Sequence, residues 1–282
     1  MKQKKQSFCD TEYGTLKQVA VCKPVHLAIR EVINETQKKY EKEGLDVELA
    51  MKQHEDFTKE METHGIDVVH LEPKEHFPEQ VFTRDIGFTL GQTIFVAEMA
   101  QKVRQGEEDH LKDWLKKTKV SYYNLLGDKI EGGDVIIDGQ NIYIGVSDRT
   151  NERAIEHLQS LLPQYAVTSI PFPHKYLHLD CIFNVLSPSD AIIYPGAMNE
   201  FDEEMITSRY DCICVSSEEQ FTLGTNVLSI GNKKVFSLPI NKDVNKQLRE
   251  RGYEVIEVDI SEIIKSGGSF RCCTMPILRS QA

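Results

Sequence analysis

The chain has 282 residues, of which 40% are hydrophobic and 27% are charged, and its formal net charge is −11. This profile is that of a globular protein with a large core, and the negative charge argues against binding to nucleic acid or to anionic membranes. The first 14 residues are charged and lack the apolar segment of a signal peptide, and no apolar run reaches membrane-spanning length. We therefore expect a cytoplasmic protein.

Five runs of β-branched and aromatic residues recur along the chain, spaced by roughly 45 to 75 residues. Each run is followed by a helical pattern and then by another apolar run. This order predicts an α/β fold built from about five repeated units. No linker rich in Gly, Ser or Pro divides the chain, so we expect a single domain over residues 1–282. The runs cover residues 18–24, 93–98, 141–147, 191–197 and 234–239.

The clearest helical patterns cover residues 46–62 and 150–163. Apolar residues recur there at helical spacing, and Pro163 ends the second pattern. Residues 255–264 predict a strand followed by a short helix. The candidate N-caps of the second helix are Ser147, Asp148 and Thr150.

The seven cysteines are an odd number, and no two of them have Cys-x-x-Cys spacing. Cytosolic thiols stay reduced, so we expect no disulfide framework and interpret most of these cysteines as small core residues. Cys212 and Cys214 are two residues apart in the apolar segment "CICV", which is typical of one face of a strand.

Four polar clusters interrupt sequence that otherwise predicts apolar strands. Charged residues in such surroundings are costly to bury unless they are paired or functional. A thiol, a histidine and several carboxylates together are typical of enzymes that use a thiol nucleophile. The clusters are "VFTRDIGFT" with Asp85, "IEGGDVII" with Glu131 and Asp134, "LHLDCIFNVL" with His178 and Asp180, and "GGSFRCCTMPI" with Cys272 and Cys273.

Each cluster also has a simpler interpretation. Asp85 and Arg84 would form a surface ion pair, and "EGGD" would form a hairpin turn. His178, which would share one face of a strand with Asp180, would be a hydrogen-bonded core residue, and the adjacent cysteines would end a buried strand. A zinc hydrolase is a further alternative, because these residue types are also metal ligands. No Cys-x-x-Cys pair supports zinc, and we expect neither a metal nor another cofactor.

Five ordered motifs resemble those of the dimethylarginine dimethylaminohydrolases, or dimethylargininases. Their superfamily modifies guanidino groups and includes arginine deiminases and amidinotransferases. The likeness covers nearly the whole chain, and it implies the pentein fold, with five ββαβ-type units around a pseudo-fivefold axis and the active site in the central channel. The motifs are "FTRD", "EGGDV", "SDRTN", "LHLD..F" and the terminal "GG..RC.TMPI".

The resemblance implies a hydrolase that acts on the guanidino group of arginine or N-methylated arginine. The reaction would pass through a covalent S-alkylthiouronium on a cysteine and give citrulline, or another ureido product, with an amine or ammonia. Cys272 matches the nucleophile, His178 the acid and base, and Glu131 a catalytic carboxylate. Cys273 would face the other way and serve packing. The residues matched to substrate binding are Asp85, Asp180, Arg149, Arg104 and Glu79.

In this match, Asp85 and Asp180 hold the guanidinium, whereas Arg149 and Arg104 hold the substrate carboxylate. A guanidinium is planar and carries several N–H donors, so a site for it needs several acceptors. The arginines also have simpler interpretations. Arg104 would be a solvated helix start, and Arg149 would form an ion pair with one of the acidic residues at a helix start, Asp148 or Glu152.

Two positions depart from the dimethylargininase pattern. Arg84 stands where an acidic residue is frequent, as it does in arginine deiminases, and Glu79 stands where aspartate is usual. Both would touch the pocket that recognises the alkylated nitrogen, so the preferred guanidino compound stays open. Arginine deiminase-like activity, amidino transfer and a non-catalytic arginine-binding module are the alternatives. Residues 24–34 match a mobile lid, and the sequence leaves open whether the chain forms a homo-oligomer.

Overall fold

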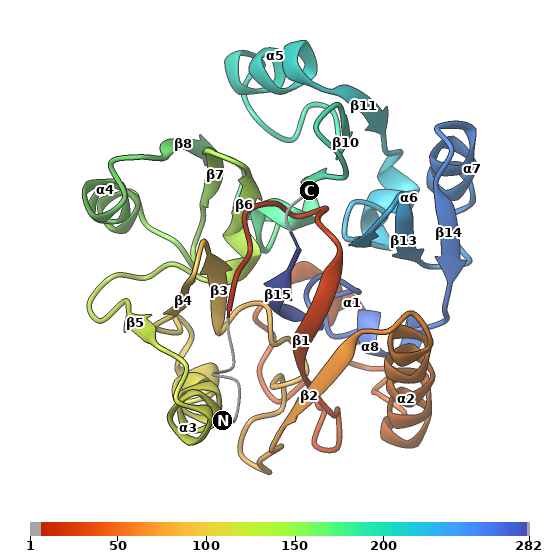
Figure 1. The fold of residues 1–282 in the computed structure, drawn as a ribbon. Coiled ribbons are helices and arrows are strands. Elements are labelled where there is room, and N and C mark those ends of the chain that lie inside the picture. The colour runs from red at the N-terminus through yellow and green to blue at the C-terminus, as the bar shows by residue number, and fades with distance from the viewer. Residues whose placement is uncertain (1–6, 281–282) are drawn as a thin grey trace.

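A computed structural model describes residues 7–280. Within these residues the strands form five three-stranded sheets around a central axis, which Figure 1 views end-on. The predicted α/β class and pentein arrangement are confirmed. The expectation of no signal peptide rests partly on residues 1–6, which lie outside the described residues. No helix in residues 7–280 combines the length and the apolar character needed to cross a bilayer.

All five sheets share one strand order. A central strand pairs antiparallel with an inner strand and parallel with an outer strand, and a helix connects the central strand to the outer one because a parallel pair needs such a crossover. The inner strands are β3 (Gly87–Leu90), β6 (Val135–Asp138), β9 (Phe183–Val185), β12 (Leu228–Gly231) and β15 (Met275–Arg279). The central strands are β1 (Leu16–Cys22), β4 (Thr93–Val96), β7 (Asn141–Val146), β10 (Asp190–Ile193) and β13 (Lys234–Ser237). The outer strands are β2 (Asp67–Leu71), β5 (Tyr122–Asn124), β8 (Ala166–Pro171), β11 (Asp211–Cys214) and β14 (Glu254–Glu257).

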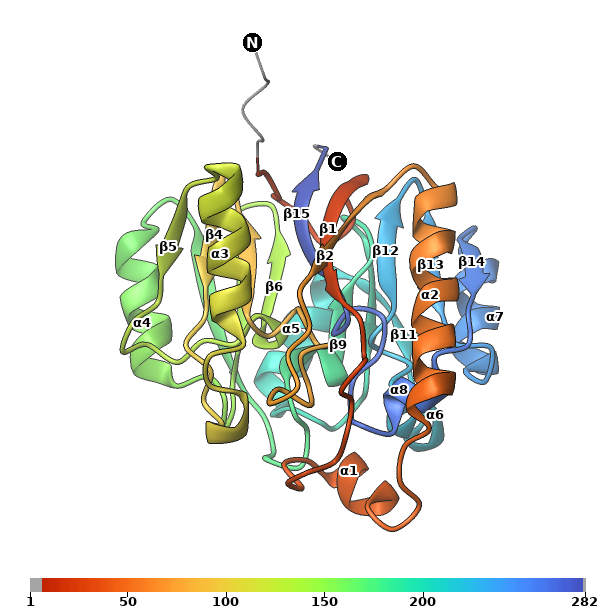
Figure 2. The same ribbon diagram turned by 90° about the horizontal axis from the view of Figure 1, so that it is seen from below.

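The five apolar runs found in the sequence are these central strands. Our reading that each run leads its unit is wrong for four units, because an inner strand precedes it there. The first unit differs, since its inner strand β15 comes from the other end of the chain and pairs antiparallel with β1. Both termini consequently lie at one end of the molecule, and α1 (Glu35–Tyr40) lies at the opposite end (Figure 2).

One long helix from each unit lies on the outside of the ring (Figure 1). Asn151 rather than Ser147, Asp148 or Thr150 caps α4, because its side chain accepts the N–H of Ala154, so the predicted N-caps are wrong. The predicted strand and short helix in residues 255–264 are confirmed as β14 and α8. The outer helices are α2 (Val47–Thr63), α3 (Glu108–Thr118), α4 (Glu152–Leu161), α5 (Glu200–Arg209) and α7 (Lys242–Glu250), and the shorter ones are α6 (Ser217–Phe221) and α8 (Ser261–Ile264).

The core is formed by the sheets and the inward faces of the helices. Phe57 of α2 is fully buried, and its ring packs edge-on against Phe236 and Phe270 at centroid distances of 5.2 and 5.0 Å. Five of the seven cysteines are buried as expected, but Cys214 is exposed and Cys212 is half-buried. Both belong to the outer strand β11, so the predictions that most cysteines are core residues and that these two lie on one strand are confirmed.

Each predicted polar cluster lies directly before an inner strand. The same holds for residues 223–227, which precede β12 and which the sequence did not bring to attention. Because the five units repeat around one axis, five loops of equivalent position meet near its centre. This explains how motifs separated by up to 187 residues, such as those of Arg84 and Arg271, come into contact.

Candidate active site

The loop of residues 267–274, named the nucleophile loop because it carries the predicted nucleophile Cys272, connects α8 to the inner strand β15. Gly267 has a φ of 102°, a conformation that residues with a Cβ rarely adopt. A Cβ on Gly267 would lie 2.6 Å from the side chain of Asn34, and one on Gly268 would lie 2.4 Å from the ring of Phe82. The two glycines therefore let the loop pass between the segment of residues 24–34 and Phe82.

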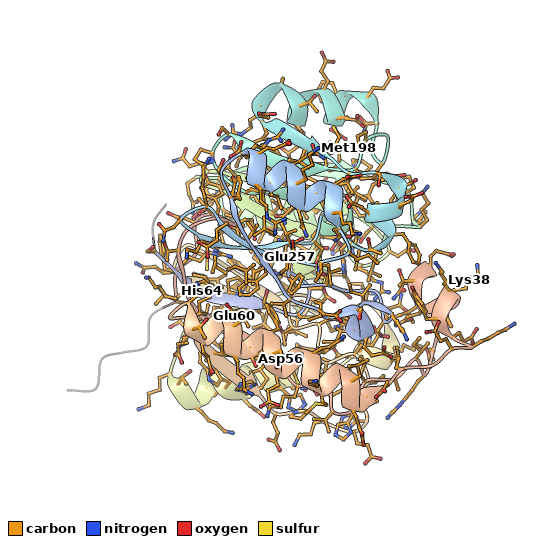
Figure 3. All side chains as sticks on the ribbon, turned by 90° about the vertical axis from the view of Figure 1, so that its right-hand side faces the viewer. Lys38, Asp56, Glu60, His64, Met198 and Glu257 are labelled. Carbon is orange, nitrogen blue, oxygen red and sulfur yellow. The ribbon has the colours of Figure 1, made fainter. Side chains whose placement is uncertain are left out.

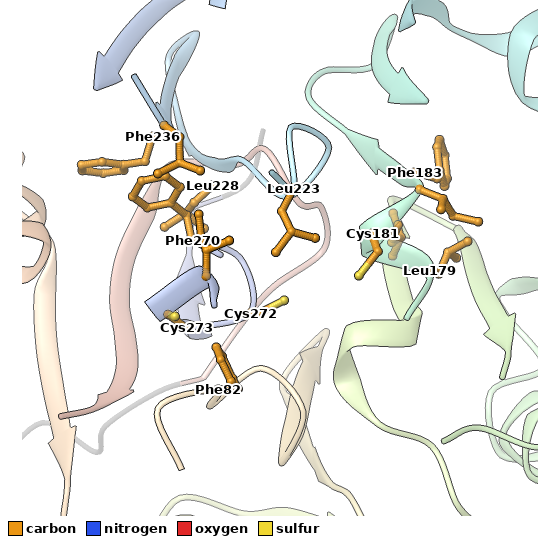
Figure 4. Close-up of a cluster of buried hydrophobic side chains, with 14 of the residues drawn as sticks. Phe82, Leu179, Cys181, Phe183, Leu223, Leu228, Phe236, Phe270, Cys272 and Cys273 are labelled. Atoms are coloured by element: carbon orange, nitrogen blue, oxygen red, sulfur yellow. The ribbon is translucent and has the colours of Figure 1, made fainter. Parts of the chain in front are cut away.

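Cys272 and Cys273 are both buried and point in opposite directions from this loop. In Figure 4 the sulfur of Cys272 points toward Leu223 and Cys181, and the sulfur of Cys273 points away from them. The backbone N–H of Cys272 donates to Oδ1 of Asn226 at 3.1 Å, which fixes the loop next to β12. The pair lies in a turn rather than in the expected strand, but the predicted opposite orientation is confirmed.

The thiol of Cys272 faces the carboxylate of Asp180. Its Sγ lies 3.7 Å from Oδ2 and 3.9 Å from Oδ1. Burial raises the pKa of Cys272 well above its usual value, and Asp180 raises it further, because both favour the neutral thiol. The thiol is therefore protonated at rest, and a bound cation would favour the thiolate.

His178 lies between two carboxylates. Its Nε2 is 2.9 Å from Oε2 of Glu131, whereas its Nδ1 is 3.6 Å from Oδ1 of Asp85, which is too far for a hydrogen bond. A Cβ on Gly133 would lie 2.6 Å from the imidazole, so glycine is required for this approach. In the segment "EGGD", the residues after Glu131 form the 3₁₀ turn η2 (Gly132–Asp134). The interpretation of this segment as a hairpin turn is therefore wrong.

The imidazole of His178 carries a proton at neutral pH. Burial alone would lower the pKa of His178, but the surrounding carboxylates outweigh burial and raise this pKa to about 9. The carboxylates are Asp85, Asp134 and Glu131. Although burial favours the neutral carboxyl, the hydrogen bond from His178 helps to lower the pKa of Glu131 below its usual value. The pair is therefore an imidazolium and a carboxylate.

Asp134 fixes the turn that carries His178. Its Oδ1 accepts the backbone N–H of Leu179 at 2.9 Å, and its Oδ2 accepts the hydroxyl of Ser147 at 2.7 Å. The turn is the 3₁₀ helix η3 (Leu179–Cys181), so the expectation that His178 and Asp180 share one face of a strand is wrong.

Asp85 has one paired and one unpaired oxygen. Its Oδ2 accepts a hydrogen bond from Nη1 of Arg104 at 2.6 Å, and its Oδ1 has no hydrogen-bond partner among residues 7–280. Arg84 is buried as well, but it approaches Oε2 of Glu12 at 3.9 Å instead of Asp85. The interpretation of Asp85 and Arg84 as a surface ion pair is therefore wrong.

Arg104 is buried in the 3₁₀ turn η1 (Lys102–Arg104), so its interpretation as a solvated helix start is wrong. Its Nη2 donates to Glu107 at 2.8 Å and to the carbonyl of Phe82 at 3.3 Å, and its Nε also donates to Glu107, at 3.1 Å. These contacts favour a role in fixing Asp85. The role predicted for Arg104 at the substrate carboxylate stays a prediction.

Asp180 is held by the residue that directly precedes Cys272. Nη1 of Arg271 donates to Oδ2 of Asp180 at 2.6 Å, and Nη2 donates to Glu12 at 3.0 Å and to the carbonyl of Val135 at 2.6 Å. All of these side chains are buried. Arg271 thus fixes the carboxylate beside the thiol and links it to β6.

Arg149 points into the molecule. Its Nη2 donates to the carbonyl of Ile33 at 3.1 Å, and its Nη1 lies 3.9 Å from Glu131 without a hydrogen-bond partner among the described residues. Asp148 pairs with His174 instead, at 2.8 Å. The interpretation of Arg149 as part of a helix-start ion pair is therefore not supported, and its free N–H groups suit a carboxylate.

Glu79 is buried beside the same segment. Its Oε1 accepts a hydrogen bond from Nε2 of Gln37 at 2.6 Å. Burial raises its pKa, while Arg104 and Arg149 oppose this effect. Arg84 lies with Glu12 and does not join Glu79, which argues against our expectation that Arg84 touches the same pocket.

Two cavities adjoin residues 33–36. One has a volume of about 40 Å³ and is lined by Ile33 and Arg149, among others. The other has a volume of about 230 Å³ and is lined by Asn34, Cys181 and Gly267, among others. Both are lined in part by residues of the segment that matches a lid, whose role as a lid stays a prediction.

Comparison with known proteins places the chain in a family. The family model described as "N,N dimethylarginine dimethylhydrolase, eukaryotic" matches residues 23–279. The N(G),N(G)-dimethylarginine dimethylaminohydrolase of Mycobacterium tuberculosis is 30% identical over 237 residues, which cover 83% of this chain and 77% of that protein. The chain belongs to the dimethylarginine dimethylaminohydrolase family. The predicted resemblance is confirmed, and so is the prediction of an enzyme of the guanidino C–N hydrolase class.

The chain is also similar to a further sequence relative and to a solved structure. The uncharacterized protein YkgA of Bacillus subtilis is 50% identical over 280 residues, 99% of this chain and 98% of that protein. The solved N-terminal domain of ArgZ, an arginine dihydrolase from cyanobacteria, superposes with a TM-score of 0.84 at 24% identity and covers 93% of this chain and 97% of its own. This likeness shows the pentein fold.

Three side chains of this family member lie close enough together to hold a metal ion. Asp85, Glu131 and His178 each offer one ligand atom within 4.8 Å of the others. The carboxylates Asp85 and Glu131 also raise the pKa of His178, so a metal ion would have to displace the proton of the imidazole. His174 and His178 have His-x-x-x-His spacing, but His174 is 79% exposed and pairs with Asp148, so the two do not form a site.

Sequence reasoning missed several residues of the site. Arg271 and Asp134 stand within the quoted motifs but were given no role, and Glu107 stands outside them. Asn226 and Gln37 lie outside every motif. A signal was present for Asn226, because residues 223–227 precede the fifth inner strand as the other motifs precede theirs. Gln37 could not be found in this way, since it comes from a surface helix.

Proposed function

We propose that the protein hydrolyses the guanidino group of arginine or an N-methylated arginine through a covalent S-alkylthiouronium on Cys272. The observation that carries this proposal is a set of buried polar atoms without partners. Oδ1 of Asp85, Nδ1 of His178 and Nη1 of Arg149 each lack a hydrogen bond among the described residues. Buried polar groups are almost always paired, so atoms of both charge types left open in one region indicate a ligand with both charges.

An amino acid with a guanidinium fits this arrangement. The guanidinium donates in one plane to several acceptors, which the carboxylates around the thiol supply. Arg149 offers N–H groups to the carboxylate at the other end of the substrate. The name of the Mycobacterium tuberculosis relative supports a methylated arginine as this substrate.

The first half-reaction forms the covalent intermediate. The bound guanidinium lowers the pKa of Cys272, and the thiol gives its proton to water. The thiolate attacks the guanidinium carbon and a C–S bond forms. His178 gives its proton to the departing nitrogen, the C–N bond breaks, and a neutral amine leaves. Cys272 then carries a cationic thiouronium, and His178 is neutral.

The second half-reaction consumes one water. Neutral His178 accepts a proton from this water, and the resulting hydroxide attacks the thiouronium carbon. The C–S bond breaks as the sulfur takes the proton of the added hydroxyl, so the thiol of Cys272 is restored and a neutral ureido product forms. Glu131 stabilises the imidazolium that is restored. In amidino transfer an amine would replace the water in this second step. The experiment must therefore distinguish hydrolysis from amidino transfer.

The test is a panel of guanidino compounds that comprises arginine, mono- and dimethylated arginine and agmatine. Citrulline and released amine or ammonia would be quantified, with and without an added acceptor amine. We expect citrulline from arginine or a methylated arginine without an acceptor, and no product from the Cys272→Ser protein. Turnover that requires the acceptor would replace hydrolysis with transfer, and binding without turnover would favour a non-catalytic module.

A further inference from the structure

Gln37 is completely buried although it belongs to a short helix at the surface. Its helix, α1, has six residues, and Gln37 is its single buried residue. A neutral amide is costly to bury without partners. The surrounding residues must therefore supply hydrogen-bond partners for the amide, and these partners indicate the role of the side chain.

The amide of Gln37 joins three separate parts of the chain. Its Nε2 donates to Oε1 of Glu79 at 2.6 Å and to the carbonyl of Ser266 at 3.2 Å. Its Oε1 accepts the backbone N–H of Ile33 at 2.9 Å. One side chain thus contacts the lid segment, a predicted substrate-binding carboxylate and the residue before the nucleophile loop.

The neighbouring residue Asn34 strengthens this connection. Its Oδ1 caps α1 by accepting the N–H of Gln37 at 2.8 Å, and its Nδ2 donates to the carbonyl of Ser266 at 3.2 Å. Gly267 lacks a Cβ where Asn34 packs against it. Residues 33–37 consequently lie against the start of the nucleophile loop through two amide side chains.

The same residues reach both proposed ends of the substrate. Ile33 accepts a hydrogen bond from Arg149, the proposed receptor of the carboxylate, at 3.1 Å. Gln37 binds Glu79 on the guanidinium side. Because the hydrogen bond from Gln37 occupies Oε1 of Glu79, it fixes the carboxylate and leaves Oε2 to accept from another donor.

We propose that Gln37 is a positioning residue that sets the orientation of Glu79 for the guanidinium and ties this orientation to the placement of residues 33–37 against Ser266. The inference rests on the proposed guanidino hydrolysis and adds a specificity device to it. A glutamine suits the position because it donates to a carboxylate without adding charge. A glutamate would place a second negative charge against Glu79, and a leucine would remove both hydrogen bonds.

The first test compares Gln37→Leu with Lys38→Ala. Lys38 lies on the same helix and projects into solvent (Figure 3), where its side chain is 67% exposed. We expect Gln37→Leu to lower kcat/KM for the guanidino substrate by roughly 10- to 100-fold, the range for a hydrogen bond to a charged group. Hydrogen exchange of residues 24–40 should become faster in this variant, and Lys38→Ala should match the wild type in both measurements.

The second test separates positioning from simple structural support. In Gln37→Glu two carboxylates face each other and bind a shared proton, so the activity relative to wild type should rise as the pH falls. The other charged groups that face Glu79 are Arg104, Arg149 and Asp85, and they are unchanged. A double variant, Gln37→Glu with Glu79→Gln, restores one amide against one carboxylate. It should recover slow exchange but not kcat/KM, because the charge no longer faces the substrate.

Several results would overturn the proposal. Wild-type kcat/KM in Gln37→Leu would remove any role in positioning. Full recovery of kcat/KM in the double variant would mean that the charge of Glu79 is not what Gln37 positions. A wild-type protein that turns over no guanidino compound would overturn the proposed function and this inference with it, whereas an active wild type with an equally active Gln37→Leu would overturn this inference alone.

Discussion

Two buried aspartates, Asp138 and Asp85, differ in how their carboxylate oxygens are paired. Asp138, at the end of β6, is 4% exposed, and both of its oxygens are paired. Its Oδ1 accepts from Tyr13 at 2.7 Å, and its Oδ2 accepts from Tyr210 at 2.6 Å and from Arg209 at 2.7 Å. Asp85 is 2% exposed, and it pairs with Arg104 through one oxygen while the other has no partner.

We interpret this difference as that between a structural carboxylate and a proposed substrate-binding one. Both residues are equally hidden and both contact an arginine, so neither burial nor charge tells them apart. The two residues differ in whether their oxygens have hydrogen-bond partners. An unpaired buried oxygen destabilises the protein, and a ligand that donates a hydrogen bond to it removes this destabilisation. Mutations in the two regions should accordingly affect different properties: turnover around Asp85, and stability around Asp138.

The largest effect is expected at the thiol beside the Asp85 region. Cys272→Ser should lower turnover by at least about 10⁴-fold, because a serine hydroxyl in this site is a far weaker nucleophile. Cys273→Ser is the matched control and should retain most of the activity. Mass spectrometry of a trapped reaction should place the adduct on Cys272, and an adduct on Cys273 would reverse the assignment.

The next largest effect is expected at the acid and base. His178→Gln should retain substrate binding and lower kcat on the order of 10² to 10⁴-fold. In the wild type, kcat/KM should fall as the pH rises through about 9, because His178 must be protonated to release the amine and its pKa is raised to about 9. The variant should lack this alkaline decrease. An unchanged decrease in the variant would assign it to another group.

A smaller effect is expected at the carboxylate end of the substrate. Arg149→Ala should lower kcat/KM for methylarginine. The corresponding loss of transition-state stabilisation should be roughly 2–4 kcal/mol, as expected for a lost partner of a charged hydrogen bond. Any activity on agmatine, which lacks the carboxylate, should hardly change. Equal losses on both substrates would mean that Arg149 supports the fold through its contact with Ile33.

The smallest effect on turnover is expected at Asp138. Asp138→Asn should lower the free energy of unfolding by about 1–3 kcal/mol, because the amide cannot accept all the hydrogen bonds that reach the carboxylate. Denaturant unfolding would measure the loss, and kcat should remain within about twofold of wild type. A large loss of kcat at unchanged stability would contradict the distinction between the two aspartates.

Much of the fold could be predicted from local patterns. The central strands were visible because they are continuous β-branched and aromatic runs, and α2 and α4 were visible from their apolar spacing. The inner strands are only three to five residues long, and β15 belongs to a sheet begun more than 250 residues earlier, so local patterns could not place them. Asn151 was missed as the cap of α4 because three other cap-forming residues stand just before it.

The sequence by itself determined which residues are candidate reacting groups. The thiol, the histidine and the carboxylates stand in short motifs before strands, and this order is a local property. The tertiary structure decided which groups are paired. Arg104 turned out to fix Asp85, and Arg271 to fix Asp180, because side chains far apart in the chain meet only where the inner strands converge. Gln37 belongs to this second class, since its buried amide owes its role to contacts with Glu79 and Ser266, 42 and 229 residues away. Pairing of buried charges depends on distances in space, and spacing along a chain does not encode them.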